Sequence, residues 1–242
     1  MNGRPADVRY ARLPALRGVA WLRDAYRMVS RARLPWLLLL FLYYLVLGLV
    51  DFVPLIGQIA APILKPVFAV GFLAAAWSQE RGGTPEPKQL FQGFRSNLWA
   101  LIPLGIVLVV GITLAVLGTA LVDDGKLLDV LSGKSKFDDA LFGDGRVQYA
   151  MLFAAALALP VMLALWFAPA LVVFHDVQPM AAMKASFSGC LKNFVPFLVY
   201  GIVGLVFFIL ALIPLGLGLL VFVPVLWASM YTAYRDIYLR PA

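Results

Sequence analysis

Hydrophobic residues in this chain occur in long unbroken runs, not in the short alternating patterns of soluble helices and strands. No charged residue falls between Lys192 and Arg235, and two similar uncharged stretches cover residues 96–122 and 147–174. A single membrane-spanning helix needs about 20 consecutive apolar residues, and each of these stretches exceeds that length. The pattern therefore predicts an all-α protein embedded in a lipid bilayer.

The apolar sequence suffices for a bundle of six transmembrane helices, which we expect to pair as three hairpins. Tight turns at 52–57 and 213–218 contain Pro and Gly, the residues that turns favour because Pro fixes φ and Gly accepts positive φ. A polar loop at 123–147 joins the middle pair of helices. The six predicted spans are 36–53, 59–79, 98–122, 149–174, 194–213 and 216–234.

An amphipathic segment precedes each predicted hairpin. In the first segment Val19, Leu22, Tyr26 and Val29 share one helical face, with arginines on the others. Apolar spacing of three and four residues beside cationic residues is typical of a helix that lies in the membrane interface. The alternative is a short helix packed on the protein itself. The corresponding segments before the second and third hairpins are 90–98 and 180–194.

These pieces repeat along the chain. Residues 91–97 align without gaps to 187–193, so that Asn97 falls on Asn193. The first unit matches the third more loosely, with Pro35 on Pro196. We interpret this as three parallel copies of one unit, in which an interfacial amphipathic helix on the cytoplasmic side is followed by a hairpin of two spans.

Positive charge is distributed unequally between the two predicted sides. With six spans, fifteen Lys and Arg lie on the side of both termini and four in the loop 123–147, which also carries six Asp. Because Lys and Arg concentrate on the cytoplasmic side of short loops, both termini are predicted to be cytoplasmic and the loop 123–147 periplasmic. The chain divides into a basic cytoplasmic segment, 1–35, and a transmembrane domain, 36–238.

The net charge of +7 has its main source in the basic segment beside the first predicted span. That location favours the anionic head groups of membrane lipids as partners, and not nucleic acid. The arginines that we expect to contact head groups are Arg17, Arg23, Arg27, Arg31 and Arg33.

Only Asp51 and Lys65 carry charge within the predicted apolar zone, and they flank the first turn. Intramembrane charges often mark a transport path. The simpler interpretation is an ion pair across the turn, with Lys65 extending toward the interface; a proton or ion site is the alternative.

Known catalytic patterns are missing from the sequence. The one histidine, His175, has no Cys or second His at metal-ligand spacing, and the one cysteine, Cys190, has no base beside it. We therefore expect a protein that is not an enzyme and has neither a cofactor nor a metal site.

Four stretches of the sequence, together with Pro179, carry a family resemblance: residues 166–176, 182–187, 191–201 and 234–238. Together they resemble an uncharacterised proteobacterial family of six-span inner-membrane proteins. That family is distantly similar to YciC-type proteins and to the membrane domain of some glycerophosphodiester phosphodiesterases. The resemblance implies a fold and an inner-membrane location but no activity, since the catalytic phosphodiesterase domain has no counterpart here.

Three polar residues in or near these stretches have a structural interpretation. Asp176 precedes Pro179 and is a candidate helix cap. Asn97 and Asn193 lie where an amphipathic segment meets a span, so that their side chains are expected to satisfy backbone groups at a kink. Binding roles are the alternative.

The combined predictions describe a non-enzymatic inner-membrane protein that acts through helix or lipid contacts, as an accessory subunit, an assembly factor or a membrane-organising protein. A larger membrane protein complex is a further expected partner. The alternative function is a carrier or flippase of a lipid or another apolar small molecule, because an uncharged bundle with proline-containing spans can open for such a substrate.

Overall fold

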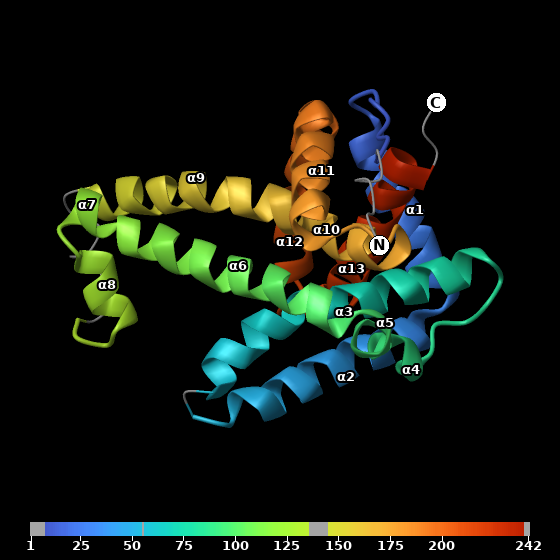
Figure 1. Cartoon of the computed structure of the whole chain (residues 1–242), viewed down its shortest axis with the longest axis horizontal. Coiled ribbons are helices and arrows are strands. Elements are labelled where there is room, and N and C mark those ends of the chain that lie inside the picture. Colours follow the sequence, from blue (N-terminus) through green and yellow to red (C-terminus); the bar gives the residue numbers. More distant parts are fainter. Residues whose placement is uncertain (1–7, 55, 136–144, 240–242) are drawn as a thin grey trace.

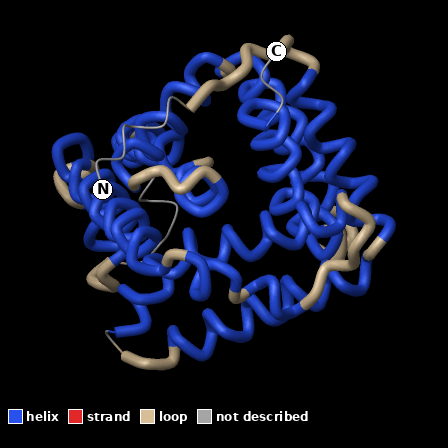
Figure 2. The backbone as a smooth tube through the Cα atoms, turned by 45° about the vertical axis from the view of Figure 1, so that its right-hand side comes forward, coloured by secondary structure: helices blue, strands red, loops and turns tan. Residues whose placement is uncertain are grey.

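The computed structural model describes residues 8–54, 56–135 and 145–239, and the regular structure within these ranges is helical, without a strand (Figure 2). Parts of the predicted segment 1–35 and loop 123–147, namely residues 1–7 and 136–144, lie outside the described residues. The longer helices are α1 (Arg17–Arg31), α2 (Arg33–Asp51), α3 (Ile56–Glu80), α6 (Leu98–Gly118), α9 (Arg146–Trp166), α11 (Pro179–Lys192), α12 (Phe194–Leu212) and α13 (Leu219–Tyr234). The shorter helices are α4 (Pro87–Leu90), α5 (Gln92–Ser96), α7 (Ala120–Asp123), α8 (Lys126–Leu131) and α10 (Ala168–Phe174), and α13 continues into a π-helical turn (Arg235–Leu239).

Five helical segments are long and apolar enough to cross a membrane: Arg33–Asp51, Gly57–Glu80, Leu98–Asp123, Arg146–Phe174 and Phe194–Leu212. The sixth predicted span corresponds to α13, which has 16 residues and is shorter than the about 20 that a span needs. Its second half, from Ala228 to Tyr234, is largely buried within the protein. The structure therefore provides five candidate spans and one shorter, partly enclosed helix where the apolar pattern predicts six.

At three places in the chain a single non-helical residue joins an amphipathic segment to the predicted span that follows it. Ala32 joins α1 to α2 with φ −141° and ψ 51°, and Asn97 joins α5 to α6 with φ −153° and ψ 64°. Asn193 joins α11 to α12 with φ −109° and ψ 28°. In each case the carbonyl of the junction residue accepts a hydrogen bond from the amide four residues later. The chain therefore changes direction without losing the first turn of the long helix.

Glycines bring the neighbouring helices close to α3. A Cβ on Gly105 of α6 would lie 2.2 Å from the carbonyl oxygen of Ile63, and one on Gly93 of α5 would lie 2.2 Å from that of Val67. Such contact is possible only without a side chain, and close helix approach through small residues is a general means of packing in membranes.

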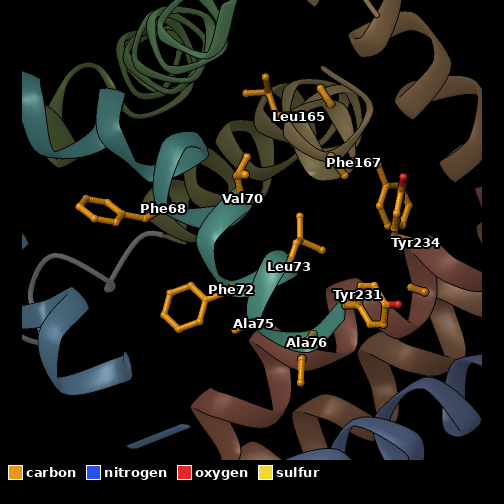
Figure 3. Close-up of a cluster of buried hydrophobic side chains, with 14 of the residues drawn as sticks. Phe68, Val70, Phe72, Leu73, Ala75, Ala76, Leu165, Phe167, Tyr231 and Tyr234 are labelled. Carbon is orange, nitrogen blue, oxygen red and sulfur yellow. The ribbon is translucent and has the colours of Figure 1, made fainter. Parts of the chain in front are cut away.

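The core surrounds α3, which lies at the centre of Figure 3. Phe68 and Phe72 project from one side of α3, and Leu73 projects toward Tyr234. On α13, Trp227 stacks against Phe72 with ring centroids 4.4 Å apart. Trp36 and Tyr43 of α2 also pack against Phe72, so that aromatic side chains hold α3 to both α2 and α13.

Helices α6 and α9 lie side by side and extend away from this core as a two-helix arm (Figure 1). The side chains that the arm exposes are largely apolar, among them Trp99, Leu114 and Leu152. At its far end the predicted polar loop contains α8, and Arg146 pairs with Asp124 at 2.6 Å. A surface this apolar is suited to contact with lipid and not with water.

The amphipathic segments are packed on the protein along part of their surface. In α1, Trp21, Ala25 and Val29 are buried, whereas Val19 and Tyr26 are exposed. The second segment is divided into α4 and α5 by Phe91. In α11 the side of Ser186 and Cys190 is buried. One face of α1 and one face of α11 are therefore packed on the protein itself, which was the alternative to helices that lie in the membrane interface.

Candidate functional site

A groove lies between α1, α12 and α13. Its volume is about 540 Å³, within the range of roughly 300–1,000 Å³ that is usual for small-molecule sites. One charged residue, Arg23, lines it. The remaining lining is Val19, Leu22, Tyr26, Phe207, Leu210, Ala211, Gly218, Val221, Phe222 and Val225.

Two close contacts between backbones frame the groove at opposite ends. At one end α1 crosses the beginning of α12, where a Cβ on Gly18 would lie 2.2 Å from the carbonyl oxygen of Pro196. At the other end the α12–α13 hairpin closes, and a Cβ on Gly218 would lie 2.5 Å from the Cα of Ala211. Between these contacts the lining side chains of α12 and α13 leave an apolar space that runs from α1 toward the hairpin turn.

The α1 end of the groove is polar. The side chain of Arg23 is 58% exposed, and its Nε lies 3.6 Å from Oδ1 of Asp24. The Tyr26 side chain is also exposed. An apolar slot that ends at an arginine and a tyrosine suits an amphiphile with a polar or anionic head, because the head remains hydrated while the tail is buried.

A network of charged side chains next to this end ties α1 to the C-terminal turn. Asp236 is buried, and its Oδ2 accepts hydrogen bonds from Nε of Arg17 and Nε1 of Trp21, each at 3.0 Å. The Nη2 of Arg17 also binds this carboxylate oxygen. The charge-assisted bonds fix the start of α1 against the end of the chain.

Arg235 continues the network toward α3. Its guanidinium pairs with Glu80 and lies 3.5 Å from Oδ2 of Asp24, and the Tyr231 hydroxyl donates to Glu80. Two interactions act on the pKa of Arg235 in opposite directions, burial lowering it and the carboxylates raising it, and the net effect is a raised pKa. Arg235 is therefore a permanent cation in this network.

The network was not predicted from the sequence. Adjacent Arg and Asp directly after the last apolar run, within Tyr234-Arg-Asp-Ile-Tyr238, are the signal that was available. Their partners on α1 and α3 lie far away in the chain, so that no local spacing identifies them.

The five arginines predicted to contact lipid head groups have different surroundings. Arg17 is committed to Asp236 and does not project freely. Arg23, Arg27, Arg31 and Arg33 are exposed. Four of the five therefore remain accessible to a membrane surface, and one of these four, Arg23, also lines the groove.

Asn193 is buried and fully engaged at the junction of α11 and α12. Its Oδ1 accepts from the amide of Leu13 at 2.9 Å, and its Nδ2 donates to the carbonyls of Ala11 at 2.8 Å and Gly189 at 3.0 Å. It satisfies backbone groups at the kink and, in addition, ties down the N-terminal segment.

The other two predicted structural residues differ from Asn193. The side chain of Asn97 is exposed and makes no cap hydrogen bond. Asp176 has φ 52° and an exposed side chain, and the N-cap position of α11 belongs to Gln178, directly before Pro179. The cap assigned to Asp176 from the sequence is therefore corrected: the left-handed backbone at Asp176 turns the chain three residues before α11 begins at Pro179.

Asp51 and Lys65 are both exposed, and no ion pair joins them. The pair predicted across the first turn is therefore not formed. Asp51 is the last residue of α2, whereas Lys65 lies in the middle of α3, so that their helical positions are offset along the hairpin.

The side chains of Ser186, Cys190 and His175, which could be reactive elsewhere, have structural roles or are partly buried here. Ser186 donates to the carbonyl of Leu163 at 2.7 Å and accepts from the amide of Phe167 at 3.0 Å, bridging the break between α9 and α10. Burial raises the pKa of the Cys190 thiol to about 12 and lowers the pKa of the His175 imidazole. Within the ranges that the structure describes, no three His, Cys, Asp or Glu are grouped to hold a metal ion.

These features describe a helical protein with five segments long and apolar enough to cross a membrane and an apolar groove between α1, α12 and α13. Over 221 residues the chain is 37% identical to the probable inner membrane protein BTH_II0599 of Burkholderia thailandensis, a match that covers 88% of this chain and 80% of the relative. The chain belongs to the family of this probable inner membrane protein. No family model matches the sequence. No solved structure matches it either.

Proposed function

We propose that this chain is a non-enzymatic inner-membrane protein that organises its surroundings through lipid contact, with the groove between α1, α12 and α13 as the lipid site. The observation that carries the proposal is the apolar lining of this groove. The groove has a volume of about 540 Å³, and Arg23 of α1 is the single charged residue among those that line it. An acyl chain fits the lining because its transfer from water is favourable wherever apolar surface is buried.

The direction of the groove supports a lipid that is held by its tail and presents its head at α1. Gly18 fixes α1 at the beginning of α12, while Ala211 and Gly218 lie at the hairpin turn. On the α13 side the lining runs from Gly218 to Val225, which at about 1.5 Å per residue corresponds to roughly 10 Å. That length accommodates part of one acyl chain between the two helices.

Six spans in three parallel repeats remain part of the proposal. Support comes from Ala32, Asn97 and Asn193, which interrupt the helix at aligned positions and share the same carbonyl hydrogen bond four residues ahead. In this arrangement α13 completes the third hairpin. The distant similarity to YciC-type proteins and to the phosphodiesterase-linked membrane domain belongs to the same proposal.

Both termini are proposed to be cytoplasmic, from the bias of Lys and Arg. Single cysteines at Thr84→Cys and Ser135→Cys test this orientation in intact cells. We expect an impermeant maleimide to label position 135 from outside and not position 84. Cys190 contributes no background because its thiol is buried and has a raised pKa. Labelling in the reverse pattern contradicts the proposed orientation.

Filling the groove tests the lipid site directly. Val221→Trp places a large side chain in the groove, and Val206→Trp makes the same change on α12 outside the groove lining. The two valines are 48% and 51% exposed, so that the substitutions are matched. We expect native mass spectrometry of the full chain in detergent to show one fewer retained phospholipid for V221W than for V206W. Equal retention contradicts the proposal.

The alternative function, a carrier or flippase, is favoured by one observation: the groove extends from α1 toward the hairpin turn and is open to the apolar surroundings. A carrier must move lipid between leaflets. Fluorescent phospholipid in vesicles containing the purified chain distinguishes the two functions by its accessibility to dithionite. Accelerated loss of inner-leaflet fluorescence, abolished by V221W, supports the carrier; unchanged loss together with a retained lipid supports the organising role.

A further inference from the structure

The arginine at the mouth of the groove has a weak partner. Arg23 is 58% exposed and its Nε lies 3.6 Å from Asp24, which is longer than a charge-assisted hydrogen bond of about 2.7–2.9 Å. Asp24 is itself shared, since its Oδ2 lies 3.5 Å from Arg235. Arg23 therefore retains donors that make no short bond to a carboxylate, whereas Arg17 has its guanidinium bound to Asp236.

The charges around the mouth favour a net negative head group. Arg27 and Arg31 are exposed on the same helix, and the adjacent carboxylate of Asp24 faces Arg23 and Arg235. A zwitterionic lipid brings a quaternary ammonium beside these cations, and like charges repel. An anionic phospholipid places its phosphate at Arg23 without that penalty, and a guanidinium binds two phosphate oxygens in parallel.

We infer that the groove is a site for one anionic phospholipid, whose phosphate binds Arg23 while an acyl chain lies between α12 and α13, and that Asp24 competes with the phosphate for Arg23. This inference rests on the proposed lipid site and adds its head-group class and its competitor.

Binding changes the partners of Asp24. When the phosphate takes over Arg23, the Asp24 carboxylate is left to Arg235, which also holds Glu80. The lipid therefore shifts one shared carboxylate toward the network that joins α1, α3 and the C-terminal turn. A bound anionic lipid should stabilise this end of the molecule beyond the burial of its tail.

The test uses the full chain in nonionic detergent, titrated with dioleoyl phosphatidylglycerol and, separately, with dioleoyl phosphatidylcholine, and read by native mass spectrometry. We expect the first bound phosphatidylglycerol to bind more tightly than phosphatidylcholine. Arg23→Gln should weaken phosphatidylglycerol binding about fivefold, from the typical contribution of one arginine near anionic lipid, and Arg23→Lys should restore much of the loss. Arg27→Gln, one turn further along α1, removes the same charge outside the groove lining and should change binding less than about twofold.

Asp24→Asn provides a test of opposite sign. It frees Arg23 and should tighten phosphatidylglycerol binding, whereas Glu86→Gln, which removes the same charge at the N-cap of α4, should leave it unchanged. Equal losses for R23Q and R27Q, or no tightening with D24N, overturn the inference. Equal affinity for the two lipids also overturns it; if V221W still removes a retained lipid, the lipid site itself stands and only its head-group class is wrong.

Discussion

Helices α3 and α6 are both long, apolar and adjacent, yet the protein encloses one and exposes the other. Over their most apolar windows 61% of α3 is buried within the protein, against 22% of α6. The composition of each helix predicts a membrane span equally well, because lipid and a protein core are both apolar. The difference shows that hydrophobicity places a helix in the membrane, while packing partners decide whether its side chains contact lipid or protein.

Polar groups at one end of α3 account for part of this difference. Gln79 accepts from Nε1 of Trp36 at 2.8 Å and donates to the carbonyl of Met28 at 2.7 Å, and Glu80 binds Arg235 and Tyr231. These bonds hold α3 to α1, α2 and the C-terminal turn. By contrast, α6 contains no charged residue and joins α9 in an apolar arm.

Matched leucine substitutions give the largest expected contrast between the two helices. Leu73→Ala in α3 removes a side chain that is 2% exposed, and Leu114→Ala in α6 removes one that is 61% exposed. We expect Leu73→Ala to lower the free energy of unfolding by about 3 kcal/mol, because it leaves a cavity among packed neighbours, and Leu114→Ala by less than about 0.5 kcal/mol. Unfolding in mixed micelles measures both. Equal effects would show that the arm is packed in the membrane as tightly as the core.

The polar end of the core is tested by Asp236→Asn. Asp236 is buried and receives Arg17 and Trp21, so that loss of its charge leaves a partly buried guanidinium without its counter-ion. Since Arg17 keeps some exposure, we expect a loss of about 2–3 kcal/mol in unfolding free energy, below that of a fully buried broken pair. Adding Arg17→Met should recover part of the loss. A double variant that is less stable than the single one contradicts the ion-pair explanation.

The two aligned asparagines sharpen the comparison at smaller scale. Asn193→Ala should cost about 1–3 kcal/mol, since it leaves the buried backbone groups of Leu13, Ala11 and Gly189 without this partner. Asn97→Ala, at the exposed junction before α6, should change stability by less than about 0.5 kcal/mol. Thermal unfolding and proteolysis of the N-terminal segment measure the difference. Comparable losses at both positions would mean that the two junctions depend on asparagine in the same way.

Asp51 and Lys65 should give the smallest effect. Because both are exposed and unpaired with each other, Asp51→Leu and Lys65→Leu should each change the melting temperature little, and their effects should add. A double-mutant cycle measures the coupling, which we expect to be below about 0.5 kcal/mol. A larger coupling energy would restore the predicted pair.

Much of the fold follows from the sequence because long apolar runs allow few solutions. The backbone in lipid must satisfy its own hydrogen bonds, so that each such run is helical. The positions of α2, α3, α6 and α12 agree with the predicted spans, and the span predicted at 149–174 is divided at Phe167 into α9 and α10. The last predicted span stays a prediction: α13 ends in buried tyrosines and a buried Asp, and in the sequence such an apolar run looks the same as one that faces lipid.

The membrane location and the helical class were predicted from the sequence alone through run length, and the junctions at Asn97 and Asn193 through local pattern. The groove, the buried role of Arg17 and the network around Asp236 were decided only by tertiary structure. Arg17 and Asp236 are 219 positions apart, and no periodicity along the chain connects two residues at that separation. Their pairing depends on α1 crossing the beginning of α12, a close contact that Gly18 permits. The same crossing places α1 beside α12 and α13, and the groove lies between these three helices.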